Sequence, residues 1–230
     1  MNVTVSSDMQ ETQRKYIYGS VLVLLLVSIL TVLAVMVSKG ATQAFDSSFI
    51  MELRNGQNPS LPLGPAWLKE MGRDVTSLGS YVFLLFVVFS SLGYLMILRK
   101  RGEAALLLMA FVGGSLLSAF LKVLVSRPRP NIATDVQVFT ASFPSGHATL
   151  ATVTFLILGV IFAGAHENKA LKVYLVAIMA LLTLMVGLSR LYLGVHYPTD
   201  VIAGWCLGGA WATACGLFAS RLRERSAYIK

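Results

Sequence analysis

The chain has 230 residues, of which 56% are hydrophobic and only 13% are charged. Soluble domains usually carry about 25% charged residues, so this composition excludes an ordinary soluble protein. It indicates one membrane-embedded domain, residues 1–230, with several spans. The net charge of +8 is expected to lie mainly in cytoplasmic loops of such a protein, and it does not require a nucleic-acid partner.

The first predicted element is a transmembrane helix from Ile17 to Val37. This stretch of 21 residues carries no charge and is about 31 Å long as a helix, which is enough to cross a bilayer. A cleaved signal peptide is the alternative, but its apolar region normally has only about 7–15 residues. Residues 1–16 are therefore expected to form a short, poorly ordered cytoplasmic tail before an uncleaved first span.

Residues 39–77 form the longest segment between predicted spans and are expected on the extracytoplasmic side. Phe45, Phe49 and Leu53 recur at helical spacing, and Pro65 suits the first position of a second short helix. Short amphipathic helices beside a membrane commonly lie in its interface. The segment is interpreted as interfacial helices, in either a packed connecting loop or a gate for a lipid substrate.

Five further apolar runs follow, separated by charged or proline-containing turns. They cover residues 78–98, 104–121, 147–165, 173–188 and 201–219, and residues 220–230 form a basic C-terminal tail. Only helices and closed barrels satisfy every backbone polar group in lipid. The predicted fold is therefore all-α, a polytopic membrane bundle of six transmembrane helices with short interfacial helices in the first extracytoplasmic loop.

An even number of spans places both termini on the same side of the membrane. Basic residues are concentrated in the N-terminal segment, in the second and fourth connecting segments and in the C-terminal tail. By the positive-inside rule these parts are cytoplasmic. The sequence thus predicts a multi-pass cell-membrane protein with cytoplasmic termini, and the polar segments described next are predicted to emerge on the extracytoplasmic side.

Three cations stand at the ends of predicted spans in an otherwise apolar sequence. Lys122 ends the third span, Arg129 follows it, and Arg190 ends the fifth. An arginine fork suits the oxygens of a phosphate group, and lysine supplies a point charge. A lone cation at a span end more often reaches out to lipid headgroups. Three cations on one side, beside two histidines, indicate an anion-binding site.

The segment Pro144-Ser145-Gly146-His147 directly precedes the fourth span. Ser145 is a good N-cap, and Gly146 permits close approach of a ligand to the backbone. A helix start presents free N–H groups and the positive end of the helix dipole, so this segment suits an anion. An ordinary helix cap is the alternative, and the adjacent His147 favours the functional interpretation.

His196 and Asp200 are four residues apart, so a helix through both would place them on one face. A carboxylate bonded to an imidazole fixes its tautomer and raises its basicity, and histidine can act as a covalent nucleophile. A second acid must then protonate the leaving group, and His147 is the candidate. A structural pair that caps the sixth span is one alternative. A zinc site is another, but the surrounding cations would repel a dication.

These three polar segments resemble the motifs of the type 2 phosphatidic acid phosphatase (PAP2) superfamily, which are Lys-x6-Arg-Pro, Pro-Ser-Gly-His and Ser-Arg-x5-His-x3-Asp. Here the motifs run from Lys122 to Pro130, from Pro144 to His147 and from Ser189 to Asp200, with no departure at a defining position. The resemblance covers residues 122–200 directly, and the six-span layout extends it over the chain. Size and topology are similar to the bacterial membrane branch of the family.

This resemblance implies roles for individual residues. It implies that His196 is the nucleophile and forms a phosphohistidine, that Asp200 orients it, and that His147 protonates the leaving lipid oxygen and then activates water. It implies that the phosphoryl oxygens are held by Lys122, Arg129, Arg190 and the backbone at Ser145 and Gly146. No cofactor or metal is expected, because fixed cations neutralise the developing charge. Arg127 and Ser189 are left without a role.

The predicted function is a metal-independent membrane lipid phosphatase whose partners are membrane lipids and a lipid phosphate substrate within the bilayer. Phosphatidylglycerol phosphate is the first candidate substrate, undecaprenyl diphosphate is the second, and a broad lipid phosphate phosphatase is the third alternative. The alternative from another class is a protein that binds or transports an anionic lipid without turnover. That protein would need the cations but not His196.

Overall fold

The computed structural model describes residues 2–132 and 140–228. Within these ranges the chain is helical apart from turns, loops and one isolated β-bridge between Arg54 and Pro62, so the all-α prediction is confirmed there. The helices are α1 (Asn2–Ser38), α2 (Gln43–Glu52), α3 (Ala66–Ser77), α4 (Tyr81–Ile97), α5 (Arg101–Val125), α6 (Gly146–Gly164), α7 (Lys169–Tyr192) and α8 (Pro198–Tyr228).

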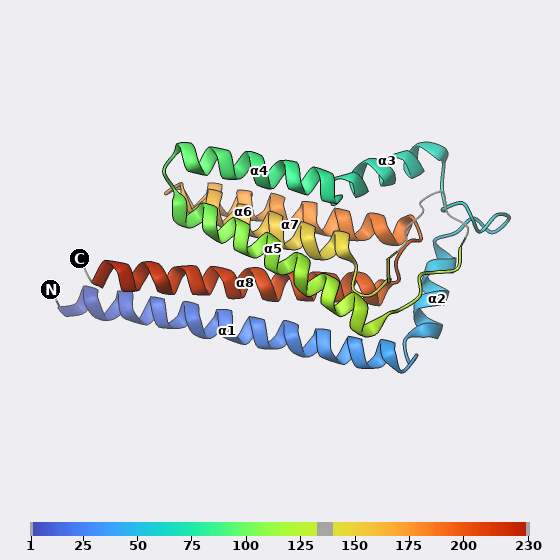
Figure 1. The fold of residues 1–230 in the computed structure, drawn as a ribbon, viewed down its shortest axis with the longest axis horizontal. Helices are drawn as coiled ribbons and strands as arrows, with labels where there is room; N and C mark the ends of the chain where they lie inside the picture. Colours follow the sequence, from blue (N-terminus) through green and yellow to red (C-terminus); the bar gives the residue numbers. More distant parts are fainter. Residues whose placement is uncertain (1, 133–139, 229–230) are drawn as a thin grey trace.

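The long helices run lengthwise beside one another, whereas α2 lies across one end of the bundle (Figure 1). The two termini lie together at the opposite end. Helix α6 packs against α5, α7 and α8, and α1 packs along α8. The end covered by α2 is the one at which α5 and α7 finish and at which α6 and α8 begin, so all four helix ends meet there.

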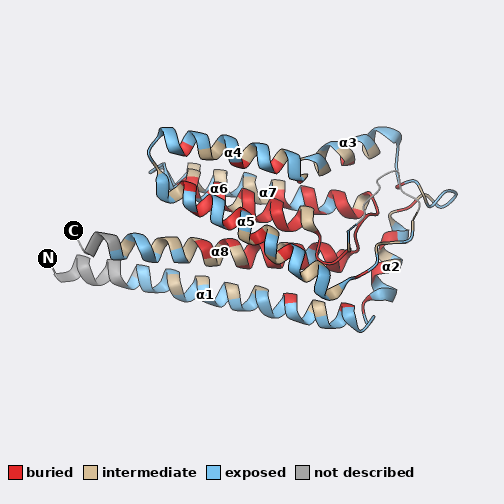
Figure 2. Ribbon diagram, in the orientation of Figure 1, coloured by how far each residue is buried: buried red, intermediate tan, exposed pale blue. Residues whose placement is uncertain are grey.

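Helix α6 is the most deeply buried of the long helices. In its most apolar window 72% of the residues are buried, against 6% in the corresponding window of α1, and Figure 2 shows buried residues along α6 and the adjoining parts of α7 and α8. An added Cβ at Gly204 would lie 2.8 Å from the carbonyl oxygen of Ser145, and one at Gly208 would lie 2.7 Å from that of Thr149. Such glycines let helices approach closely in lipid, so they fix α8 against the start of α6.

Five helices, α1, α5, α6, α7 and α8, are individually long and apolar enough to cross a membrane. Helices α3 and α4 meet at a bend of 44° and pass the same test only as a pair, which gives a sixth span if the pair is counted as one. The predicted span over 78–98 is therefore shorter in the structure. The side chain of Ser80 caps α4 by accepting a hydrogen bond from the N–H of Phe83, which starts a new helix at this point.

Residues 1–16 were predicted to form a poorly ordered tail. This prediction is wrong for the backbone from Asn2 onward, because α1 begins there. Helix α8 likewise continues to Tyr228, through most of the predicted tail over residues 220–230. Neither segment contains proline or glycine, so nothing breaks the helix that the adjoining span begins. The helix predicted around Phe45 is confirmed as α2.

Candidate active site

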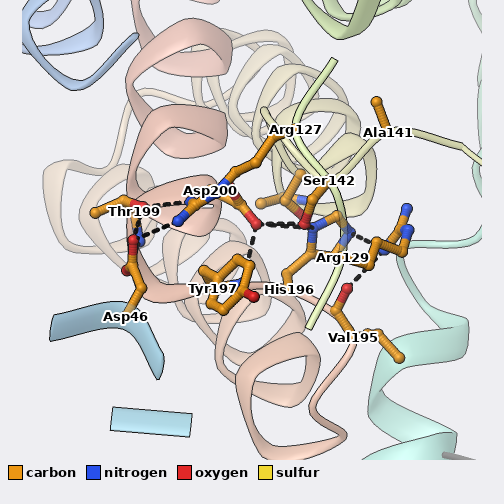
Figure 3. A network of polar contacts seen from close by, with 12 residues as sticks. Asp46, Arg127, Arg129, Ala141, Ser142, Val195, His196, Tyr197, Thr199 and Asp200 are labelled. Atoms are coloured by element: carbon orange, nitrogen blue, oxygen red, sulfur yellow. Dashed lines mark hydrogen bonds and ion pairs between the residues drawn. The ribbon is translucent and has the colours of Figure 1, made fainter. Parts of the chain in front are cut away.

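The three polar segments meet at the end of the bundle that α2 covers. Lys122 belongs to the last turn of α5, and Arg129 follows in the loop after it. His147 lies in the first turn of α6. His196 lies in the non-helical residues 193–197 between α7 and α8, which we call the α7–α8 turn. Figure 3 shows the centre of this cluster.

The Nδ1 atom of His196 lies 3.6 Å from the Oδ2 atom of Asp200, and both side chains are buried. One helix does not run through both residues, because α8 begins only at Pro198. Instead, the backbone N–H of Tyr197 donates to Oδ2 of Asp200 at 2.9 Å. This bond caps α8 in the manner of a capping box and folds the turn onto the carboxylate. Asp200 thus has both proposed roles, as a helix cap and as a partner of the imidazole.

Arg129 faces the other ring nitrogen of His196. Its Nη1 atom lies 3.0 Å from Nε2 of His196 and 2.6 Å from the carbonyl oxygen of Val195 (Figure 3). A guanidinium only donates hydrogen bonds, so we assign Nε2 as the acceptor and place the ring proton on Nδ1, toward Asp200. The lone pair of the imidazole therefore points to the side from which Arg129 approaches.

The buried position of His196 also sets its charge. Burial lowers the pKa of His196 to about 3, while the hydrogen bond with Asp200 acts in the opposite direction. Desolvation disfavours the charged form of an imidazole, so His196 is neutral at physiological pH. A neutral ring with its proton on Nδ1 keeps an electron pair on Nε2, which is the form that a nucleophile requires.

Asp200 is held by two further side chains. Arg127 donates from Nη1 to Oδ1 at 2.7 Å, and the hydroxyl of Ser142 donates to Oδ2 at 2.5 Å. The same hydroxyl lies 3.3 Å from Nδ1 of His196. Arg127, which was left without a role, is therefore part of the site, and Ser142 was not predicted at all. Its place two residues before Pro144 was the only signal, and a serine in a loop is too common to be informative.

Lys122 approaches the start of α6. Its Nζ atom donates to the carbonyl oxygen of Ala141 at 2.6 Å. A Cβ added at Gly146 would lie 3.6 Å from Cε of Lys122, so the aliphatic part of the lysine side chain passes beside the backbone at Gly146. The predicted proximity of the first and second polar segments is thus observed.

Ser145 is the N-cap of α6, as predicted: its side chain accepts a hydrogen bond from the N–H of Ala148. Its own N–H donates to the carbonyl oxygen of Asp200 at 2.9 Å. That N–H is therefore engaged in the structure, and the donors that the described part of the chain leaves free in this helix turn are those of Gly146 and His147. The hydrogen bond also ties α6 to α8, and with them the second and third polar segments.

His147 is partly exposed and lies within electrostatic range of Arg190, His196, Arg129 and Lys122. Arg190 is buried and donates from Nη1 to the hydroxyl of Thr76 at 2.9 Å, while its Nε has no partner within the described residues. A buried donor without a partner is costly, and an anion at this site would supply one. The structure thus brings all the predicted side chains to one end of the bundle.

The family model of the PAP2 superfamily matches residues 103–224, more than half of the chain. The chain belongs to the PAP2 superfamily. The family resemblance stated from the motifs is therefore confirmed, and the matched range contains every residue that was predicted for the site.

The proteins similar to this chain include several that are named as phosphatases of lipids. Phosphatidylglycerophosphatase B of Bacillus subtilis is 35% identical over 148 residues, which are 62% of this chain and 70% of that protein. Undecaprenyl-diphosphatase of Sulfolobus acidocaldarius is 27% identical over 212 residues, which are 85% and 87% of the two chains. A crystal structure of a transmembrane PAP2-type phosphatidylglycerolphosphate phosphatase from Bacillus subtilis superposes with a TM-score of 0.78 at 28% identity and covers 86% of this chain and 96% of its own. Family and fold together support a phosphatase.

Proposed function

We propose that the protein hydrolyses a lipid phosphate through a phosphohistidine on His196. The observation that carries this proposal is the position of that ring between a cation and a carboxylate: Nε2 faces Arg129 at 3.0 Å, and Nδ1 faces Asp200 at 3.6 Å. The cation can bind a phosphoryl oxygen beside the electron pair that attacks, and the carboxylate stabilises the ring as it becomes charged.

In the first step, Nε2 of His196 attacks phosphorus, and the bond from phosphorus to the lipid oxygen breaks. His147 donates a proton to that oxygen, so the lipid leaves as an alcohol. The imidazole becomes positively charged as the bond forms, and Asp200 stabilises the proton that remains on Nδ1. Lys122, Arg129 and Arg190 neutralise the phosphoryl oxygens.

In the second step, His147 removes a proton from a water molecule that attacks the phosphorus of the phosphohistidine. The bond between phosphorus and Nε2 breaks, its electron pair returns to His196, and inorganic phosphate is released. His147 thereby regains the proton that it gave to the lipid oxygen in the first step. No other group needs to be oxidised or reduced, and the net reaction is the addition of water across the phosphorus–oxygen bond.

We further propose that this chemistry needs no metal ion. Both oxygens of the Asp200 carboxylate already accept hydrogen bonds, from Arg127 on one side and from Ser142 on the other, so a metal would have to displace protein donors. The fixed cations supply the positive charge that metal ions supply in other phosphatases.

Phosphatidylglycerol phosphate is the substrate we propose first, and the homology to phosphatidylglycerophosphatase B favours it. Undecaprenyl diphosphate is the second candidate, because the similarity to undecaprenyl-diphosphatase extends over 85% of the chain. We expect purified protein to release phosphate from phosphatidylglycerol phosphate in excess chelator, with a higher kcat/KM than for undecaprenyl diphosphate. The reverse order would assign undecaprenyl diphosphate as the substrate.

The chelator also tests the metal-independent mechanism. Activity that is lost in chelator and restored by zinc or magnesium would refute it.

We also propose that the site opens on the extracytoplasmic side, because the opposite end carries the basic connecting segments and the C-terminal basic residues. Gln57 and Glu167 are exposed. Gln57 lies in the connection between α2 and α3, and Glu167 lies in the connection between α6 and α7, at the opposite end of the bundle (Figure 1). Both native thiols, Cys206 and Cys215, are buried. In intact cells, a membrane-impermeant thiol reagent is expected to label Gln57→Cys but not Glu167→Cys. Labelling of only the second variant would show that the bundle is inverted.

A further inference from the structure

We propose that α2 is a positioning element for the nucleophile, and that it acts through Asp46 and Arg54. This inference rests on the proposed role of His196. Helix α2 lies across the end of the bundle at which α7 ends and α8 begins (Figure 1). Both residues lie outside the range 103–224 that the family model matches, and neither belongs to the three motifs. The segment was predicted to be a connecting loop or a lipid gate.

Asp46, in the first turn of α2, reaches the start of α8. Its carboxylate is fully buried and accepts two hydrogen bonds from Thr199, from the N–H at 3.2 Å and from the hydroxyl at 2.7 Å. Thr199 is the second residue of α8. A carboxylate at this point satisfies a free N–H and faces the positive end of the helix dipole. Asp46 therefore anchors α8 one residue before Asp200.

Asp46 also completes the ion pairs of Arg127. The guanidinium donates from Nη2 to Asp46 at 2.7 Å and from Nη1 to Asp200 at 2.7 Å, and its side chain is buried (Figure 3). A buried cation between two carboxylates leaves one net negative charge. Without Asp46, the full positive charge of Arg127 would act on Asp200. The Asp200 carboxylate would then stabilise a charged His196 less well.

Arg54 follows the C-cap of α2 and reaches the end of α7. It is 4% exposed, and its Nη2 donates to the carbonyl oxygens of Tyr192 and Leu191, the last two residues of α7. A cation there binds carbonyl oxygens at the helix end, of which that of Leu191 also accepts from the N–H of Gly194, and it faces the negative end of the helix dipole. A Cβ added at Gly194 would lie 3.0 Å from Nη1 of Arg54, so the guanidinium also packs against the α7–α8 turn.

The two charges therefore hold the α7–α8 turn from both ends. The acid binds the helix start that follows the turn, and the base binds the helix end that precedes it, so each charge has the sign that its helix end favours. His196 lies between these two anchors. The N–H groups of residues 193–195 bond back to carbonyl oxygens of α7, so the backbone of the turn follows the helix ends that the two charges hold. Asp46 and Arg54 are positioning residues in this sense, because neither has to touch the substrate.

The test replaces each charge by a side chain of similar shape in the full-length protein. Asp46→Asn and Arg54→Met are expected to lower kcat by about 10- to 100-fold, by analogy with residues that orient metal ligands, with KM for the lipid substrate nearly unchanged. Orthovanadate, which mimics the five-coordinate phosphoryl state and bonds to the nucleophile, is expected to bind more weakly in parallel with the loss of kcat. Arg54→Lys is expected to retain most of the activity, since it keeps the charge.

Ile50→Ala is the matched control, because Ile50 lies on the same helix, is 1% exposed and offers only packing. It is expected to lower the melting temperature while leaving kcat per folded enzyme and the inhibition constant for vanadate as in wild type. A mere loss of folded protein changes neither that constant nor KM. The inference is overturned if Asp46→Asn and Arg54→Met keep wild-type vanadate inhibition, or if they behave as Ile50→Ala does.

His196→Ala, measured in parallel, separates the two levels of the proposal. If that variant still releases phosphate at the wild-type rate, the proposed function fails, whatever the α2 variants do. If it is inactive while Asp46→Asn and Arg54→Met are indistinguishable from wild type, only the role of α2 fails.

Discussion

His196→Ala is expected to lose phosphate release by roughly 10⁵- to 10⁶-fold, as is usual when a covalent nucleophile is removed. The ring is 1% exposed and contacts both Arg129 and Asp200, and alanine supplies no atom that can attack phosphorus. With a substrate labelled in its phosphate, rapid quenching at alkaline pH is expected to trap labelled protein from wild type and none from the variant. The label should be released by acid, because a phosphorus–nitrogen bond at histidine is acid-labile.

The same variant also separates an enzyme from a protein that only binds an anionic lipid. Lys122, Arg129 and Arg190 remain in His196→Ala, so binding of the lipid phosphate is expected to persist while turnover disappears. A variant that still turns over would refute the phosphohistidine. A wild-type protein that binds the lipid but never releases phosphate from any lipid in the panel would favour the binding protein.

Asp200→Asn is expected to lower kcat by roughly 10³- to 10⁴-fold, comparable to the loss when a carboxylate that orients a catalytic histidine becomes an amide. An amide can present its NH₂ group to Nδ1 of His196, which moves the ring proton to Nε2 and removes the electron pair that attacks. The change also leaves Arg127 with Asp46 as its one acidic partner. The measurement is kcat and KM in detergent, together with the melting temperature.

Glu103→Gln is the matched control for an acid-to-amide change. Glu103, in the first turn of α5, pairs at 3.3 Å with Arg223 of α8, and both side chains keep access to solvent. These helix ends lie at the end of the bundle opposite α2 (Figure 1). Such pairs contribute about 0–1 kcal/mol, so activity and melting temperature are expected to stay near wild type. An Asp200→Asn variant that behaves as Glu103→Gln does would show that the carboxylate is not needed to orient His196.

The side chains that meet in the candidate site could be predicted because they are polar residue types that an apolar sequence otherwise avoids. His147, His196 and Asp200 stand out at span ends, and their spacing carries information even without a helix. Their local geometry could not be predicted in the same way. His196 and Asp200 meet through the capping bond from Tyr197, not through one helical turn, because the residue spacing alone does not say where α8 begins.

The residues that support Asp200 could not be predicted for a different reason. Arg127 and Ser142 lie in the connection between α5 and α6, and Asp46 lies in α2. All three are far from Asp200 in sequence, and their contacts exist only once the helix ends have met. None has an unusual local context: an arginine before proline, a serine in a loop and an aspartate in a short helix are all common. Their role depends on contacts between residues that are distant in the chain, and a single sequence contains no direct signal of such contacts.

The spans were predictable to the extent that hydrophobicity sets them. Apolar length identifies α1, α5, α6, α7 and α8, and each of these meets the criteria for a span in the structure. The bend between α3 and α4 was not predicted, because the run over residues 78–98 is long enough by itself and gives no sign that a helix approaches it at 44°. The helical extension of α1 to Asn2 was missed because polarity was taken as a sign of disorder.

The contact between Arg129 and Nε2 of His196 bears on how the site would distinguish its substrate from the surrounding phospholipids. Most surrounding lipids are phosphodiesters, with one negative charge and two free oxygens, and they vastly outnumber any substrate. A terminal phosphate carries more charge and a third free oxygen, so it competes far better for a guanidinium. Under the proposed mechanism, a ligand must draw Arg129 away from Nε2 of His196 before that atom can attack, and a terminal phosphate does this better than a phosphodiester. The proposed mechanism thus explains why His196 would not react with the phosphodiester lipids of the surrounding bilayer.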